Sequence, residues 1–508
     1  MQFLLKILFL FFAFLSSLNI QGQRPEDSQT DHYHLTFLDT QPRSIAVQAT
    51  LNLSDSLLFM NRHDGKAARW PEHIHDVKVF DMQGHQLEVD RPDSLSWVLE
   101  EVPEGKQVKL EYTLLVDHEE EEWSGGIDGV AFGRDYGVMS SGRALFVMNG
   151  TDKEITLTAD LPESWKLSVP WPSTENTEEG FYIADHETLT EAFLFAGTHE
   201  EVNLRRGPFT LKFVLGGKNV QAEKERYAHA AERILDYYVQ LMGGIPNTGD
   251  AAERFTSMVM INEGESVDGE VIGDHISMLL NPTADPQNQL IGWFIFAHEF
   301  FHLWNGKSIR FEGTTSDWFK EGVSNYYTIK ALYQTGFVDE EALKAVLNGL
   351  FYQRYVNDPG FGKKTPVEAA AWDTKDDHWG LIYGGGLFAG ICMDMEIRHQ
   401  SANEKCLDML MRDLYREYAG SRDLVTNDVI IERTKDLGFT GFDEFFNGYL
   451  NGTAHVPLLR YLSHAGLDVS TENQALILSL TQQITPLQEA IWNGFLGNHS
   501  CVNTERPE

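Results

Sequence analysis

The chain has 508 residues, of which 40 are basic and 76 are acidic, so its formal net charge at pH 7 is −36. An anionic field of this size opposes binding to nucleic acid or to an anionic membrane surface, and it favours solubility and the attraction of cationic peptide ends. The length suggests about two to four domains with large cores.

The first 22 residues predict a secretory signal peptide. A single lysine, Lys6, precedes an apolar core from Ile7 to Leu15, and small and polar residues follow. Ser16 and Ser17 interrupt the apolar run before it reaches the ~20 residues that a membrane span requires. We therefore expect cleavage near Gly22, a secreted or periplasmic mature chain, and no membrane insertion of that chain.

Residues 23–216 show the alternation of half-buried strands. Apolar side chains fall on one side of the stretch from Ser44 to Ser54 and again from Gln107 to Val116, with a Pro103-Glu104-Gly105 turn before the second. The pattern predicts an N-terminal antiparallel β domain, either a sandwich or a saddle-shaped sheet. No catalytic constellation is visible in this half.

The periodicity changes to that of a helix at Val220. Apolar residues line one face up to Leu241, and Gly243-Gly244 is expected to end the helix. A strand follows at Phe255 to Ile261. The next segment, INEGESVDGEVIGDHISMLLNP, is dense in glycine and carboxylates and is expected to end in a second strand.

The stretch from Trp293 to Tyr327 contains an H-E-x-x-H pattern made by His298, Glu299 and His302. Its two histidines are one helical turn apart, so they project from one face of a helix. This geometry suits one zinc ion, which takes three protein ligands in a catalytic site and keeps a fourth position for water. Glu299 would then act as general base for that water.

Glu321 is the candidate third zinc ligand. Eighteen residues lie between His302 and Glu321, and the surrounding apolar residues predict a second helix that packs beside the first. Asn325, one turn further on, is placed to hydrogen-bond the far nitrogen of a liganding histidine. Two histidines on an aromatic-rich helix could also be ordinary core residues, but the added carboxylate favours the zinc site.

The chain resembles the glycyl aminopeptidase family of zinc gluzincin metallopeptidases. The resemblance rests on four stretches, which are HEFFHLWNGKSIR, DWFKEGVSNYY, YGGGLFAGICMDMEIR and YLNGTAHVPLLRYLSHAGL. It implies an α+β multidomain fold in which the N-terminal β domain is followed by a thermolysin-like, mainly helical zinc metallopeptidase domain at residues 217–466. It also implies removal of N-terminal residues, with glycine or alanine suggested, from peptide substrates.

The resemblance further implies a carboxylate that holds the substrate's free α-amino group. The usual motif of the family is not cleanly present, and Glu270 is our first choice for this anchor, with Asp274 next. His275 and Ser277 could shape the same sheet edge. An anionic anchor pairs with a protonated amine and fixes its distance from the metal. The alternative is that the segment is simply a polar loop.

Tyr383 matches the family position of a tyrosine whose hydroxyl donates to the oxyanion formed on attack. It stands three residues before Gly386, and a buried tyrosine without a catalytic role is the alternative. The lysine that is common in the family just before this glycine is Gly385 here. The role of that positive charge is therefore in question, whereas the tyrosine is unaffected.

The C-terminal part contains further core helices and the three cysteines. Cys392 and Cys406 lie among apolar helix positions and are expected to be core thiols, and Cys501 lies in a polar stretch where it could pair with another chain. The family usually continues into a PDZ module after Leu467. Residues 467–508 are too few for a complete one, so we expect a tail.

The sequence thus predicts a zinc-dependent aminopeptidase with one zinc ion. Two alternatives remain. The first is an endopeptidase of the same chemistry that lacks a working amine anchor. The second is a peptide-binding protein with a degenerate site, which the combination of three ligands and a positioned Glu299 disfavours.

Overall fold

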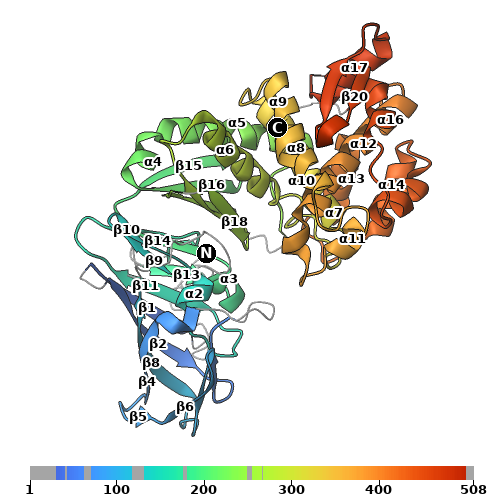
Figure 1. Cartoon of the computed structure of the whole chain (residues 1–508). Helices are drawn as coiled ribbons and strands as arrows, with labels where there is room; N and C mark the ends of the chain where they lie inside the picture. Colours follow the sequence, from blue (N-terminus) through green and yellow to red (C-terminus); the bar gives the residue numbers. More distant parts are fainter. Residues whose placement is uncertain are drawn as a thin grey trace, which may run out of the picture.

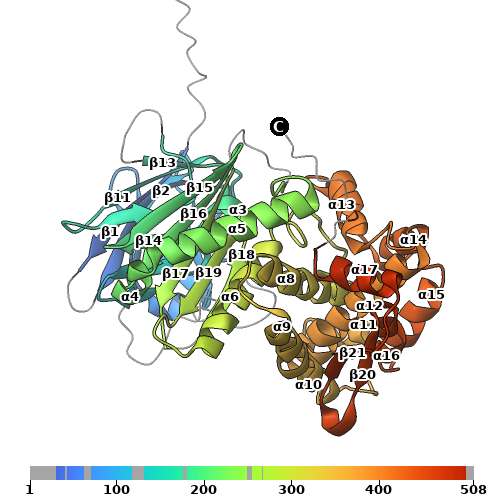
Figure 2. The same cartoon turned by 90° about the horizontal axis from the view of Figure 1, so that it is seen from above.

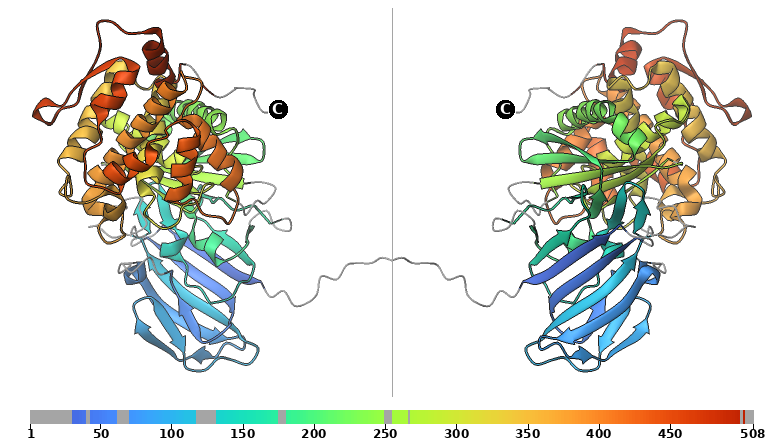
Figure 3. Two further views of the ribbon diagram at one scale, coloured as in Figure 1. Left: turned by 90° about the vertical axis from the view of Figure 1, so that its right-hand side faces the viewer. Right: turned by 90° about the vertical axis from the view of Figure 1, so that its left-hand side faces the viewer.

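A computed structural model of the chain describes residues 30–39, 43–61, 70–116, 131–174, 180–248, 255–265, 267–498 and 501 (Figure 1). The expected signal peptide lies outside these residues. The strand-rich N-terminal part forms one end of the molecule and the helical C-terminal part the other, with a five-stranded sheet between them (Figure 3). The predicted order, a β-rich domain followed by a mainly helical one, is confirmed.

The N-terminal part is built on a seven-stranded sheet in the order β13-β11-β1-β2-β8-β4-β5. All of its described neighbours pair antiparallel except β1 and β11, which are parallel. The strands of this sheet are β1 (Asp31–Leu38), β2 (Ser44–Asn52), β4 (Ile74–Asp81), β5 (Gln86–Leu87), β8 (Gln107–Leu115), β11 (Ile155–Asp160) and β13 (Gly180–Ile183). As predicted from alternation, the apolar residues of β2 and β8 point into one core.

Two smaller sheets, two short α-helices and the 3₁₀ helix Trp70–His73 complete this part. The first sheet has the order β3-β7-β6 and the second β12-β14-β10-β9. These elements are β3 (Leu57–Phe59), β6 (Val89–Asp93), β7 (Ser96–Leu99), β9 (Phe132–Arg134), β10 (Gly137–Ser141), α2 (Gly142–Leu145), β12 (Lys166–Ser168), α3 (His186–Thr190) and β14 (Phe193–Gly197).

A five-stranded sheet, in the order β15-β16-β17-β19-β18, joins the two ends of the molecule and is called the central sheet below. Its strands are β15 (Glu200–Arg206), β16 (Phe209–Gly216), β17 (Phe255–Glu263), β18 (Asp268–Ile272) and β19 (His275–Leu280). The boundary that the sequence placed at residue 216 assigns β15 and β16 to the N-terminal domain, whereas the structure pairs β16 in parallel with β17. Apolar residues of β16 enter the same core as the helices that follow.

Helices α5 (Lys224–Met242) and α6 (Pro286–Phe301) cover this sheet, and α4 (Lys218–Ala222) precedes them (Figure 2). The predicted end of α5 is confirmed, because its cap Gly243 has the left-handed φ of 79° that glycine adopts at low cost. The other face of the sheet meets the N-terminal part through a cluster that includes Phe193, Phe195, Met258 and Met260.

The remaining helices pack into one continuous core with α5 and α6. They are α7 (Asp317–Lys320), α8 (Gly322–Gln334), α9 (Glu340–Val346), α10 (Gln353–Val356), α11 (Pro366–Ala369), α12 (Gly385–Gln400), α13 (Leu407–Tyr418), α14 (Asn427–Asp436), α15 (Phe442–Phe445), α16 (Leu458–Leu462) and α17 (Pro486–Phe495). Within the described residues, one helical stretch, Gly380–Gln400, is long and apolar enough to cross a bilayer, but it is 94% buried inside the protein and is a core helix.

The segment after Leu467 is folded, which corrects the expectation of a tail. It forms the antiparallel pair β20 (Leu467–Ser470) and β21 (Ile477–Leu480), followed by α17. Ile491, Trp492 and Phe495 of α17 are buried in the helical core. Threonine at the N-cap and proline at the first turn of α17 are local signals for this helix.

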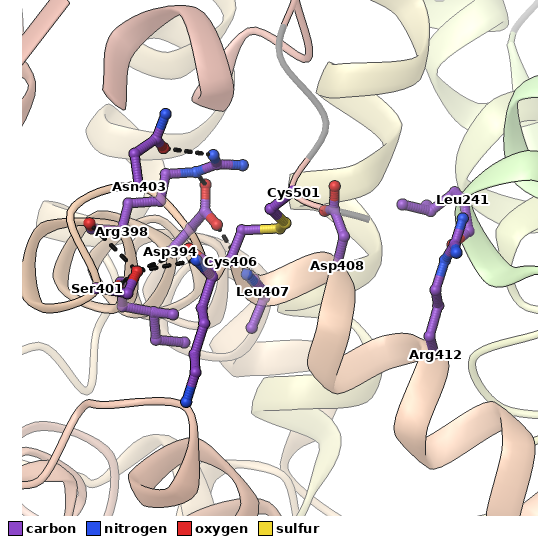
Figure 4. Close-up of a disulfide and its surroundings, with 12 residues drawn as sticks. Leu241, Asp394, Arg398, Ser401, Asn403, Cys406, Leu407, Asp408, Arg412 and Cys501 are labelled. Atoms are coloured by element: carbon purple, nitrogen blue, oxygen red, sulfur yellow. Dashed lines mark hydrogen bonds and ion pairs between the residues drawn. A yellow bond between two sulfur atoms is a disulfide. The ribbon is translucent and has the colours of Figure 1, made fainter. Parts of the chain in front are cut away.

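The expectation for the cysteines is partly wrong. Cys406 and Cys501 form a disulfide within the chain, with their Cα atoms 6.0 Å apart (Figure 4). Cys406 is therefore not a free core thiol, and Cys501 does not pair with another chain. Only tertiary folding brings these residues together, since 95 positions separate them. Cys392 is a free, buried thiol, as predicted.

Candidate metal centre

The first histidine of the H-E-x-x-H pattern, His298, lies in the last turn of α6, and the second, His302, directly follows the end of this helix. Most side chains of α6 from Trp293 to Phe301 are buried in the helical core, which fixes the rotation of the helix about its axis. His298 and His302 are themselves only 6% and 9% exposed. Packing therefore holds both imidazole rings, except on the side where the two rings face each other.

Glu321 stands at the junction between α7 and α8 and turns its carboxylate toward both histidines. Its Oε2 lies 3.5 Å from Nε2 of His298 and 3.1 Å from Nε2 of His302, and the two Nε2 atoms are 3.1 Å apart. The structure thus brings together the three predicted ligands. They meet in space although one of them comes from a different helix.

These three atoms fit a zinc ion. Ligand atoms about 2.0–2.1 Å from a tetrahedral ion are roughly 3.3–3.4 Å from one another, close to the separations found here. Nδ1 of His302 lies 3.0 Å from the carbonyl oxygen of Asn305, an acceptor, so Nδ1 carries the proton and Nε2 presents its lone pair. Two ring nitrogens and a carboxylate oxygen that converge in this way form a cation site.

Asn325 does not take the role predicted for it. Its side-chain amide donates to the backbone carbonyl of Tyr383 at 3.4 Å, and the far nitrogen of His302 is held by the Asn305 carbonyl instead. Nδ1 of His298 has no hydrogen-bond partner within the described residues. The residue missed by sequence reasoning is Asn305, whose buried side chain also donates to the Lys320 carbonyl and to Ser324.

Lys375 is a second residue that sequence reasoning missed. Its Nζ lies 3.0 Å from Oε1 of Glu321 and 2.7 Å from Oδ2 of the fully buried Asp317. Burial alone would raise the pKa of Glu321, but the charge of Lys375 holds it well below its usual range. The two residues are 54 positions apart in the chain, so no local motif could have indicated this contact.

Glycine allows the close approach that places Tyr383 beside this cluster. A Cβ at Gly386 would lie 2.0 Å from the carbonyl oxygen of Trp318, and one at Gly322 would lie 2.3 Å from Gly386, so α12 can pack against α7 and α8 only without these side chains. The ring of Tyr383 is 6.1 Å from that of His298.

The surroundings of Tyr383 keep its hydroxyl protonated. Burial raises its pKa, the charges of Glu321 and Glu299 add to the rise, and the charge of Lys375 opposes it. Glu299 is partly exposed, unlike the histidines on either side of it.

The two predicted amine anchors lie at the edge of the central sheet. One is in the edge strand β18, and the other is in the turn between β18 and β19. Glu270 is in β18, opposite Ser277 of β19, and its side chain is outside the described part of the structure. Asp274 follows Gly273, whose φ is 54°, in the turn between β18 and β19. The charge of Asp274 acts on Lys307, which closely follows His302 in the chain, so this carboxylate is near the loop that ends α6.

The two residues expected to shape this edge differ in their contacts. His275 accepts a hydrogen bond at Nδ1 from the backbone N–H of Met258 at 3.1 Å. Burial and the charge of Lys307 lower the pKa of His275 to about 3, so its ring is neutral. The hydroxyl of Ser277 is buried without a hydrogen-bond partner in the described residues.

Two stretches of the chain match models of one peptidase family. Residues 68–198 match the Peptidase M61 N-terminal domain, and residues 293–384 match M61 glycyl aminopeptidase. Comparison with curated proteins gave no match. The predicted resemblance is therefore confirmed at the level of both parts of the chain.

Solved structures share the fold. A crystal structure of an aminopeptidase N family protein from Idiomarina loihiensis is similar with a TM-score of 0.74 and 18% identity, over 87% of this chain and 79% of that chain. A variant of an M1 zinc metallopeptidase from Deinococcus radiodurans, bound to a Tyr-Ser-Ala substrate, has a TM-score of 0.52 and 13% identity, over 85% of this chain and 95% of that one. At these identities the likeness shows the fold alone.

Proposed function

We propose, from its likeness to the M61 glycyl aminopeptidase models, that this chain is a zinc peptidase that removes N-terminal residues from peptides. The observation that carries the proposal is the convergence of the buried side chains of His298, His302 and Glu321, whose facing atoms lie within 3.5 Å of one another. A structural role for two buried histidines would not need their bare Nε2 atoms to face each other and a carboxylate.

Bound zinc would polarise the substrate carbonyl and lower the pKa of a water to about 7. The carboxylate of Glu299 accepts a proton from the attacking water and later passes it to the leaving amine nitrogen. The Tyr383 hydroxyl donates a hydrogen bond to the carbonyl oxygen as negative charge develops there. Its raised pKa supports this role, because a donor has to keep its proton.

The preference for a free N-terminus would come from a carboxylate on the edge of the central sheet. Asp274 is supported by its nearness to the loop after His302, and Glu270 by its place on the edge strand β18. Either one would pair with the protonated α-amine and fix the first peptide bond at a set distance from the metal. Small first residues, glycine or alanine, follow from the family likeness.

We also propose that the protein acts outside the cytoplasm. The N-terminal 22 residues have the composition of a secretory signal. The Cys406–Cys501 disulfide supports this, since such bonds persist in oxidising compartments. The partners would be peptides with a cationic free end, which the net charge of −36 attracts.

Metal analysis combined with a panel of amino-acid anilides tests the proposal. We expect about one zinc per chain and hydrolysis of glycine and alanine anilides that is lost when the α-amine is acetylated. Equal hydrolysis of free and acetylated substrates would indicate an endopeptidase of the same chemistry. A purified protein without stoichiometric zinc would contradict the proposal and favour a peptide-binding protein.

A further inference from the structure

The ammonium group of Lys375 ties a third segment of the chain to the proposed zinc site. Lys375 begins the short 3₁₀ helix Lys375–His378, after α11 and far in sequence from both α6 and α8. Its Nζ lies 3.0 Å from Oε1 of Glu321, whereas the other oxygen of the same carboxylate faces the two histidines. The two oxygens of Glu321 therefore have different partners.

Asp317 makes this contact more than a surface ion pair. It is fully buried, lies one helical turn before Glu321, and accepts from Lys375 at 2.7 Å. The side chain of Lys375 is itself only 17% exposed. One ammonium group thus bridges two buried carboxylates and offsets both their mutual repulsion and part of the cost of removing them from water. The more exposed Lys320 lies beside the same two carboxylates.

The same segment also contacts Tyr383, the proposed hydrogen-bond donor to the oxyanion. Nζ of Lys375 lies 5.7 Å from the ring centre of Tyr383, and Trp379 stacks on that ring with centres 5.0 Å apart and an angle of 3° between the planes. The segment that begins with Lys375 therefore contacts both the candidate metal-binding carboxylate and the tyrosine.

We propose that Lys375 is a positioning residue, which holds the outer oxygen of Glu321 so that Oε2 alone is presented to zinc beside His298 and His302. A carboxylate that is already held in its binding orientation loses less conformational freedom when the ion binds, so the affinity for zinc rises. The inference rests on the proposed function only in requiring that this site holds zinc.

The test is the zinc affinity of Lys375→Met, measured by competition with a chelator and without substrate. Loss of such an outer partner typically weakens metal binding 10–100-fold, and we expect a change of this size. Lys320→Met is the matched control, because Nζ of Lys320 lies 3.0 Å from Asp317 and 3.5 Å from Glu321 but its side chain is 25% exposed. We expect a change of about threefold or less, because the side chain of Lys320 is more exposed than that of Lys375 and its ammonium group lies farther from Oε1 of Glu321, at 3.5 Å against 3.0 Å.

A second variant keeps the test decisive if the buried Asp317 prevents Lys375→Met from folding. In Lys375→Met combined with Asp317→Asn one carboxylate is removed together with the ammonium group, and Lys320 still lies 3.5 Å from Glu321, so the fold should be kept while Glu321 loses its contact with Lys375. Thermal unfolding of the zinc-free proteins checks this point, and the double variant should also bind zinc at least tenfold more weakly.

The outcomes separate this inference from the proposed function. Unchanged zinc affinity in a folded Lys375 variant, or an equal loss in Lys320→Met, would overturn the positioning role while leaving the zinc peptidase intact. Tight zinc binding that depends on Lys375, in a protein that cleaves no peptide, would support the positioning role and contradict the peptidase. A wild-type chain that binds no zinc would overturn both.

Discussion

At the scale of single residues, the candidate metal ligands and the proposed general base differ in burial. The three candidate ligands are buried, whereas Glu299, between the two histidines, is partly exposed. A general base has to reach both the attacking water and the leaving amine, so some access to solvent suits this role. Ligands, in contrast, gain from packing that fixes their geometry.

Glu299→Gln should abolish turnover while zinc stays bound. Glutamine has nearly the shape of glutamate but cannot accept the proton of the attacking water, so we expect kcat to fall by about 10²–10⁴-fold. Metal analysis and anilide hydrolysis on the same sample measure the two effects. Glu312→Gln, at an exposed position, is the control. An active, zinc-loaded Glu299→Gln protein would remove this mechanism.

Tyr383→Phe should lower kcat by about 10²–10³-fold with little change in KM, because the hydroxyl acts on charge that develops only during the reaction. Since burial raises the pKa of Tyr383, loss of its proton should not limit the rate of the wild type at any pH up to about 10, the usual tyrosine pKa. Steady-state kinetics checks both points, with Tyr182→Phe on the N-terminal sheet as the control. A change in KM alone would indicate a role in binding.

At the scale of elements, the site depends on how three helices and one sheet edge are held against each other. The break between α7 and α8 places Glu321 where its carboxylate can reach α6, and the glycines at 322 and 386 let α12 approach. Buried polar groups fix α8 further along, where Tyr326 donates to Asp394 and Lys330 pairs with Asp408. These contacts make α8 a rigid support for Glu321.

His275, at the start of β19, should make the folded protein less stable in mild acid. The folded chain keeps His275 neutral because its pKa is about 3, whereas the unfolded chain takes up a proton below the usual histidine pKa of about 6.5. Stability is therefore fully present above about pH 6.5 and falls as the pH drops below that value. At pH 5 the loss is on the order of 2 kcal/mol.

Urea midpoints at pH 7 and pH 5 check this expectation. In His275→Asn the side-chain oxygen can still accept from the N–H of Met258 but does not titrate, so the acid-induced drop should be smaller than in the wild type. His85→Asn is the control, because the side chain of His85 is 80% exposed. Equal drops in both variants and the wild type would show that His275 does not contribute.

At the scale of the whole molecule, the helical part is closed by contacts between distant segments. Helix α17 packs on the core, and the disulfide joins the start of α13 to residue 501 (Figure 4). The segment expected to be a tail is therefore part of the domain that carries the site. Its apolar residues near 491–496 had a helical pattern that could have indicated this.

The denatured protein should take up one alkyl group before reduction, on Cys392, and three after it. Reduction should also lower the stability by about 2–4 kcal/mol, because the bond constrains a long segment of the unfolded chain. Mass spectrometry counts the groups, and thermal unfolding with and without reductant measures the second effect. Three alkyl groups on the unreduced protein would show that the cysteines are free.

The sequence by itself determined the strands of β2 and β8, the helices α5 and α6, and the three residues that meet at the candidate metal centre. Each of these follows from a local period or from a short motif, because side chains two, three or four positions apart share a face in a strand or helix. The family likeness added Tyr383, which no period could have indicated.

Only the tertiary structure decided the other features. Lys375 reaches Glu321, β15 and β16 join the later strands, Cys406 pairs with Cys501, and Asn325 turns to Tyr383 instead of a histidine. These contacts join segments far apart in the chain, and no local spacing encodes them. Their partners are fixed by the way in which the apolar faces of the helices and the central sheet pack together, which is a property of the whole chain.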